Sequence, residues 1–140
     1  MVSILSSCSG KPPDAIGIRL SGLTGCPKSP NCVSSKAKGA QHIVEPFLIK
    51  GDAKVSWSIV KSVIISMPNC LMVTATTNYI HAECRSRIFR FADDLELFFN
   101  SSSGMISIRS ASRIGYSDFG VNRRRVEFLQ SELRAKRAIE

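Results

Sequence analysis

The stretch from Tyr79 to Glu127 has the clearest pattern in this chain: YIHAECRSRIFRFADDLELFFNSSSGMISIRSASRIGYSDFGVNRRRVE. Apolar and polar side chains alternate from Tyr79 to Ile88, from Asp94 to Phe99 and again from Ile106 to Arg109, after a Ser-Ser-Ser-Gly turn. Because neighbouring side chains of a strand point to opposite faces, this period of two predicts three consecutive antiparallel strands with one apolar and one polar face.

The polar face of these strands is expected to hold a cross-strand row of charges. A register that keeps the apolar side chains on one face places Ile88 opposite Leu95 and Arg87 opposite Glu96. The same argument in the next strand places Arg109 opposite Glu96. We therefore expect Arg87, Glu96 and Arg109 side by side on a solvent-exposed surface, where each ion pair contributes about 0.2 to 1 kcal/mol.

Further strands and two helices flank this stretch. We expect one strand over His42–Ile49, at a sheet edge because it contains a proline, and another over Cys70–Thr76. Apolar residues at helical spacing predict a helix over Ala53–Met67 with Asp52 as its N-cap. A second amphipathic pattern predicts a C-terminal helix that runs to about Arg137.

The strand that starts at Cys70 is expected to join the central strands through a tight turn at Thr77-Asn78. A regular hairpin around that turn sends Cys70 and Cys84 to opposite faces of the sheet. The pattern thus predicts that these two cysteines do not form a disulfide.

The order strand, helix, four strands, helix predicts an α+β fold. Its expected form is an antiparallel sheet of about five strands with both helices on one face, a two-layer sandwich. Residues 1–24 are expected to form a flexible N-terminal tether because residues 9–24 are rich in Gly, Pro and Ser. Residues 25–140 are expected to form a single α+β domain, since 140 residues suffice for one core.

The N-terminus reads MVSILSSC, and Leu5 to Cys8 match the lipobox at which bacterial lipoprotein precursors are cut before a lipidated cysteine. What precedes Cys8 is shorter than a signal segment, so either the start is truncated or misassigned, or the match is chance. Lipidation of Cys8 would account for one of five cysteines and predicts a membrane tether. The expected location is then the bacterial cell envelope, membrane-anchored or periplasmic; it is cytoplasmic if Met1 is the true start.

The loop from Cys26 to Cys32, CPKSPNC, contains two prolines and is expected to be rigid. In an oxidising compartment we expect a disulfide between Cys26 and Cys32, and free thiols are the alternative hypothesis. A metal site needs two more ligands, and neither His42 nor His81 has a convincing spacing, so we expect no metal and no cofactor. A catalytic thiol is equally disfavoured, because no activating neighbour is evident.

The formal net charge of +8 raises the question of nucleic acid or anionic lipid as a partner. Six of the fifteen residues from Arg123 to Arg137 are Lys or Arg, but no aromatic side chains are interleaved as a stacking platform. We therefore expect a solvated basic helix and no nucleic acid. The three arginines at positions 123–125 do not suit the positive end of a helix dipole and invite a carboxylate such as Asp118, or an external anion.

Four motifs resemble the widespread family known as domain of unknown function 1499. They are CPKSPNCVSS from Cys26, HIVEP from His42, HAECRSRIFRFADDLEL from His81 and IRSASRIGYSDFGVNRRRVE from Ile108. The resemblance covers about residues 22 to 130. Many bacterial members look like lipoproteins or exported proteins, which supports the lipobox reading, and the resemblance implies no established activity.

The density of polar residues predicts a non-catalytic binding or scaffolding module of the bacterial envelope, whose partner is an unknown protein or a small anion. Arginine forks suit carboxylates and phosphates. One alternative is an enzyme that uses His81 with the Asp93-Asp94 pair; another is a structural network around Arg113 and Asp118 or Asp93. The candidate ligand-binding residues are His81, Arg85, Arg87, Glu96, Arg109, Arg113, Tyr116, Asp118, Asn122 and Arg123.

Overall fold

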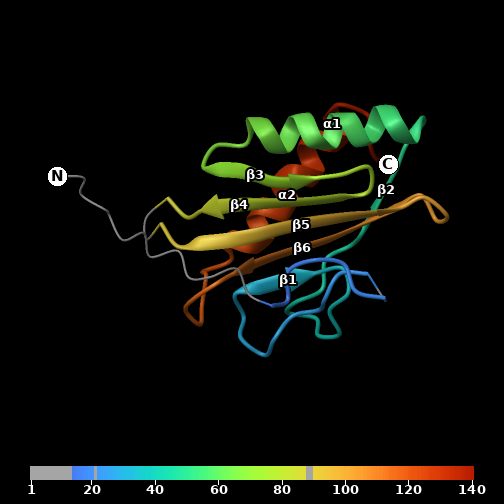
Figure 1. The fold of residues 1–140 in the computed structure, drawn as a ribbon. Coiled ribbons are helices and arrows are strands. Elements are labelled where there is room, and N and C mark those ends of the chain that lie inside the picture. The colour runs from blue at the N-terminus through green and yellow to red at the C-terminus, as the bar shows by residue number, and fades with distance from the viewer. Residues whose placement is uncertain (1–13, 21, 88–89) are drawn as a thin grey trace.

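The computed structural model describes residues 14–20, 22–87 and 90–140. Its strands form one antiparallel sheet in the order β1-β6-β5-β4-β3, with β2 also paired to β6 (Figure 1). The elements are β1 (Cys32–Ser34), β2 (Phe47–Leu48), α1 (Ala53–Ser66), β3 (Cys70–Ala75), β4 (Tyr79–Arg85), β5 (Ala92–Asn100), β6 (Met105–Ser112) and α2 (Val121–Ala135). The predicted α+β class and element order are confirmed, with β1 as an additional edge strand.

Both helices cover the same face of the sheet, as predicted, and the core lies between these two layers (Figure 1). The apolar stripe of α1 and that of α2 meet the apolar positions of the alternating strands, so that each amphipathic element buries the face its sequence period defines. The fully buried contributors are Val60, Ile64, Ile80, Leu95, Leu97, Ile106, Ile108, Leu129 and Leu133. Neither helix of the described residues is long and apolar enough to span a membrane.

The ends of the helices follow from local chemistry. Asp52 caps α1, because its Oδ1 accepts a hydrogen bond of 2.9 Å from the amide of Val55. The helix ends at Ser66, one residue before its expected end, since Pro68 follows. The second helix begins at Val121, before Val126, the first residue of the amphipathic pattern Val126, Leu129 and Leu133 that predicts it.

The predicted register is right for one pair of strands and wrong for the other. Glu96 lies opposite Arg109 across β5 and β6, as expected. Across β4 and β5, however, its partner is His81, and Arg87 lies exposed in the turn beyond the end of β4. The two registers differ by an even number of residues, so both keep the apolar side chains on one face. Alternation therefore could not distinguish them.

A β-bulge explains a second error. Thr74 pairs with His81 but Met72 pairs with Ala82, so the register shifts by one residue at Val73. This shift turns the first half of β3 over and brings Cys70 opposite Cys84, where they form a disulfide with an S–S distance of 2.03 Å. The prediction that these cysteines stay apart was wrong because it assumed a regular hairpin.

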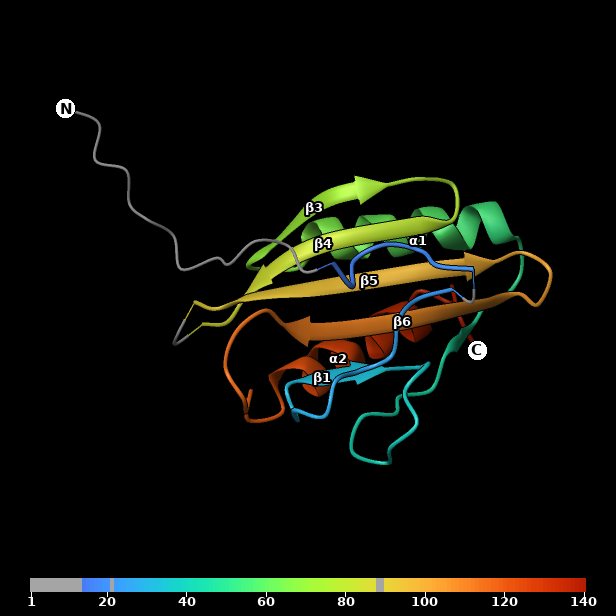
Figure 2. The same cartoon turned by 60° about the horizontal axis from the view of Figure 1, so that its bottom comes forward.

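The sheet face opposite the helices is not solvent-exposed, contrary to the prediction. Residues 14–20 and 22–25 cross it in front of β4, β5 and β6, as Figure 2 shows. Gly17 donates its amide to Glu96, and Leu23 is buried. Residues 14–20 and 22–24 of this segment belong to the stretch that was expected to form a tether. Residues 1–13, including Cys8, lie outside the described residues.

Candidate functional site

The covered face of the sheet holds a buried set of ionisable side chains, which we call the sheet-face network: Tyr79, His81, Asp94, Glu96, Arg109 and Arg113. Oδ1 of Asp94 lies 2.7 Å from Nε2 of His81 and accepts a bond of 2.8 Å from Nη2 of Arg113. Oδ2 of Asp94 accepts from Nε of Arg113 at 2.8 Å. Burial by itself raises the pKa of Asp94, but the hydrogen bonds from Arg113 and His81 outweigh it and hold that pKa below its usual value.

Glu96 is the second centre of the sheet-face network. Its Oε2 accepts bonds of 2.6 Å from the hydroxyl of Tyr79 and 2.9 Å from the amide of Gly17. Its Oε1 lies 3.5 Å from Nη1 of Arg109. Burial, and then the bond to Glu96, raise the pKa of Tyr79, so the phenol stays a neutral donor.

The contacts of this network point to a structural role for most of its members. Arg113 donates two hydrogen bonds to the carboxylate of Asp94, and its Nη2 also lies 3.1 Å from Glu83. The sequence had predicted Asp118 or Asp93 as its partner. His81 lines neither of the two pockets described below. A general base must reach substrate, so this placement gives no support to the alternative of His81 as an acid–base catalyst.

A second polar cluster holds the start of α2 against the sheet. Nδ2 of Asn122 donates to Ser112 and Asp118, and its Oδ1 accepts from Ser110 and Arg125. Arg125 in turn lies 2.7 Å from the carboxylate of Asp93, on the helix side of β5. The side chains of Asp93 and Asp94 thus point to opposite faces of the sheet, because the two residues occupy successive positions of one strand.

Asp118 serves the N-terminus of α2 itself. It accepts bonds from the amides of Gly120 and Asn122. Burial raises the pKa of Asp118, but these bonds and that from the Asn122 side chain lower it overall. The expected pairing of Asp118 with the arginines at 123–125 is absent, since Arg123 donates to the carbonyls of residues 41 and 43 and Arg124 to that of Phe119.

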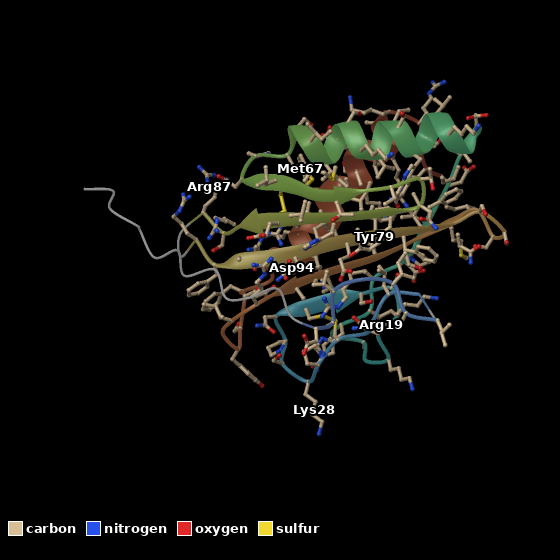
Figure 3. All side chains as sticks on the ribbon, viewed as in Figure 1. Arg19, Lys28, Met67, Tyr79, Arg87 and Asp94 are labelled. Atoms are coloured by element: carbon tan, nitrogen blue, oxygen red, sulfur yellow. A yellow bond between two sulfur atoms is a disulfide. The ribbon has the colours of Figure 1, made fainter. Side chains whose placement is uncertain are left out.

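A cleft of about 1060 Å³ opens on the helix side, between the end of α1, the start of α2 and the ends of β4 and β6. We call it the helix-side cleft. Most of its wall is apolar, and the Cys70–Cys84 disulfide forms part of it. Figure 3 places Met67 and Arg87 at this end of the molecule. The apolar lining residues are Met67, Pro68, Phe91, Ile114, Phe119, Val121 and Phe128.

The charged residues of the helix-side cleft are predominantly basic. Four arginines line it, Arg85, Arg87, Arg124 and Arg125, against two aspartates, Asp93 and Asp118. Asp93 forms an ion pair with Arg125, and Asp118 accepts a hydrogen bond from the Asn122 amide at the N-terminus of α2. The remaining charge in the cleft is therefore positive, which favours an acidic group on whatever binds there.

Phe119 stands at the rim of this cleft in a strained conformation. Its φ is +53°, a left-handed value that non-glycine residues adopt rarely, and its side chain is 76% exposed. Gly120, next in the chain, also has a positive φ. Backbone strain and an exposed aromatic ring beside an apolar cleft are both features found at binding sites.

The ten candidate residues of the sequence do not form one site. His81, Glu96, Arg109 and Arg113 meet in the sheet-face network, and Asn122 lies in the cluster at α2. Arg85, Arg87 and Asp118 line the helix-side cleft. Tyr116 is exposed on the loop after β6, and Arg123 binds backbone carbonyls.

Sequence reasoning missed the residues that make the cleft. Phe91, Phe119 and Phe128 are apolar side chains outside the alternating core pattern, and that mismatch was the available signal. Within the residues that the structure describes, no three His, Cys, Asp or Glu side chains come close enough to hold a metal ion.

Comparison with known families gives one match. A family model described as a protein of unknown function, DUF1499, matches residues 22–133, which is most of the chain and includes both clusters and the cleft. No curated protein matches the chain.

Proposed function

This chain belongs to the DUF1499 family of proteins of unknown function, and from that premise we propose that it is a non-catalytic binding module of the cell envelope. Its ligand is an apolar molecule with an acidic group, taken up in the helix-side cleft. The observation that carries the proposal is the cleft itself, an apolar hollow of about 1060 Å³ with an excess of arginine. Clefts of roughly 300 to 1,000 Å³ are typical of small-molecule sites.

The wall of the cleft is suited to binding and not to turnover. Its basic groups are arginines, which donate hydrogen bonds and do not act as general bases. Its carboxylates, Asp93 and Asp118, are occupied by Arg125 and by backbone amides. A ligand that enters would therefore be held by apolar contact and by charge, without a free acid–base pair beside it.

Two disulfides support the envelope part of the proposal. Cys26 pairs with Cys32, for which the sequence favoured a disulfide, and Cys70 pairs with Cys84. Disulfides persist in exported and periplasmic proteins and are rare in a reducing cytosol. The tether through a lipidated Cys8 is part of the same proposal, and detection of a lipid on Cys8 by mass spectrometry of the native protein would test it.

The binding proposal is tested with an apolar anionic probe. The protein is unfolded, stripped of bound molecules, refolded and titrated with anilinonaphthalene sulfonate, whose fluorescence rises in apolar sites. A long-chain fatty acid is then added as competitor. We expect saturable probe binding that the fatty acid displaces, and at least tenfold weaker binding in Phe128→Glu, because a carboxylate in the wall repels the acidic ligand.

Val55→Glu is the matched control. Val55 lies on α1, is 59% exposed and does not line the cleft, so the same change of charge there should leave probe binding unchanged. Equal loss in both variants, or probe binding that a fatty acid does not displace, would contradict the proposal.

A further inference from the structure

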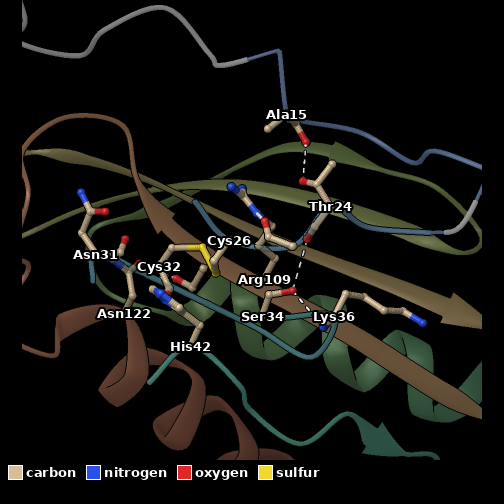
Figure 4. The surroundings of a disulfide bond; sticks show 12 residues. Ala15, Thr24, Cys26, Asn31, Cys32, Ser34, Lys36, His42, Arg109 and Asn122 are labelled. Carbon is tan, nitrogen blue, oxygen red and sulfur yellow. Dashed lines mark hydrogen bonds between the residues drawn. A yellow bond between two sulfur atoms is a disulfide. The ribbon is translucent and has the colours of Figure 1, made fainter. Parts of the chain in front are cut away.

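A second pocket lies on the other face of the sheet, between the crossing N-terminal segment, the Cys26–Cys32 loop and the ends of β5 and β6. Its volume is about 480 Å³. We call it the strap-side pocket. Its polar lining residues are Ser29, Asn31, Asp94, Arg109, Ser112 and Arg113. Figure 4 shows Arg109 beside Thr24 and the disulfide that closes one side of the pocket.

Arg109 is the unusual member of this lining because it is 4% exposed and its guanidinium is only partly satisfied. Nε donates to the carbonyl of Gly25 at 3.1 Å, and Nη1 lies 3.5 Å from Glu96. Its third nitrogen, Nη2, makes no hydrogen bond to the described residues. No fully enclosed side-chain nitrogen or oxygen of those residues lacks a partner, so Nη2 must reach open space, and Arg109 lines this pocket.

The other charges around the pocket are already committed. The carboxylate of Asp94 is hydrogen-bonded to Arg113 and His81. Oε2 of Glu96 accepts hydrogen bonds from the Tyr79 hydroxyl and the Gly17 amide. Nη2 is therefore a charged donor available to a ligand, and a hydrogen bond from it to an anion would be charge-assisted.

From this geometry we propose that the strap-side pocket binds a small organic carboxylate, with Arg109 as its anchor. A carboxylate oxygen suits the N–H groups of Nη2, because an ionised acceptor and a guanidinium form a charge-assisted hydrogen bond. The two arginines of the lining are balanced by Asp94 and Glu96, so the pocket favours a single negative charge over a dianion such as phosphate. The hydroxyl of Ser29 suits a ligand that carries a hydroxyl group beside its carboxylate.

This site does not depend on the proposed role of the helix-side cleft. The two pockets lie on opposite faces of the sheet and have only Ser112 in common. They also take different ligands, since one wall is apolar and the other is polar. Failure of one proposal therefore leaves the other standing.

The test follows the Nε–Hε signal of Arg109 by nuclear magnetic resonance in the whole chain. The probes are acetate, glycolate and glycerate, with inorganic phosphate as the comparison. We expect a saturable shift at millimolar glycolate or glycerate, a weaker response to phosphate, and binding weakened at least tenfold in Arg109→Gln, measured by calorimetry.

Two further variants keep the result decisive. Ser29→Phe fills the pocket from the loop without removing the arginine, so it should abolish binding even if Arg109→Gln does not fold. Arg123→Gln removes an arginine that lines neither pocket and should bind normally. No saturable shift with any carboxylate, tighter binding of phosphate, or equal loss in Arg123→Gln would overturn the proposal.

Discussion

Asn122 is the residue on which the attachment of α2 to the sheet most depends. It is fully buried. Its side-chain nitrogen donates hydrogen bonds to Asn31, Ser112 and Asp118, and its side-chain oxygen accepts hydrogen bonds from Ser110 and Arg125. No other side chain of the same size supplies donors and an acceptor in this arrangement.

We expect Asn122→Ala to lower the free energy of unfolding by about 3 kcal/mol, because several buried groups lose their partners at once. Urea denaturation measures this loss. Gln130→Ala, on the same helix but outside the cluster, serves as control and should cost about 0.5 kcal/mol or less. A loss no larger than that of the control would mean that water replaces the amide.

Asp94 makes the stability of the protein depend on acid. Its pKa is lowered in the folded state, so its contribution is present above the unfolded value of about 3.9 and is lost as pH falls through the lower folded value. We expect the thermal midpoint to fall more steeply below about pH 4 in the native protein than in Asp94→Asn. Calorimetric scans at a series of acidic pH values test this, and parallel curves would contradict it.

At the scale of elements, the bulge in β3 decides which cysteines meet. The extra residue at Val73 lets Cys70 face Cys84 across the strand pair, at a sequence separation of 14. The other disulfide, Cys26–Cys32, closes a separation of only 6. Since the entropy removed from the unfolded chain grows with loop length, the two bridges should differ in what they contribute.

The double variant Cys70→Ser, Cys84→Ser should lose about 3 kcal/mol of unfolding free energy, and Cys26→Ser, Cys32→Ser about 2 kcal/mol. Each is compared with the native protein by denaturation in urea without reductant. The reverse order would show that contacts in the folded state, and not the loop lengths, govern the effect.

At the scale of the whole molecule, the N-terminal segment closes the polar face of the sheet. Gly17 reaches Glu96 through its backbone amide, and Thr24 joins the segment to β1 through Ala15 and Ser34 (Figure 4). The family match begins at residue 22, so this cover extends beyond the matched region.

Gly17→Pro tests how much this cover contributes. Proline has no amide hydrogen for Glu96 and cannot adopt the φ of +108° found there. We expect a loss of about 1 to 3 kcal/mol and faster hydrogen exchange in β5, because a buried carboxylate loses a donor. Leu20→Ser, at a fully exposed position of the same segment, is the control and should leave both quantities unchanged.

Much of the architecture follows from local pattern alone. The alternation around Leu95 and Leu97 predicts the strands, the helical spacing from Trp57 predicts α1, and Asp52 marks where it begins. These features depend on residues close together in the chain, where side-chain direction follows from the backbone period. The register of β5 against β6 is also predictable, since a short turn leaves few alternatives.

Pairings between distant residues required the tertiary structure. The register of β4 against β5 leaves little trace in the local pattern, because a shift by an even number of residues keeps the same side chains on each face. The bulge at Val73 adds one residue, which moves the side chains before it to the opposite face of the sheet. Burial of the polar face depends on where the N-terminal segment packs. Thus short-range periodicity determines which elements form, whereas long-range packing determines which charges are buried, which cysteines pair and where the two pockets open.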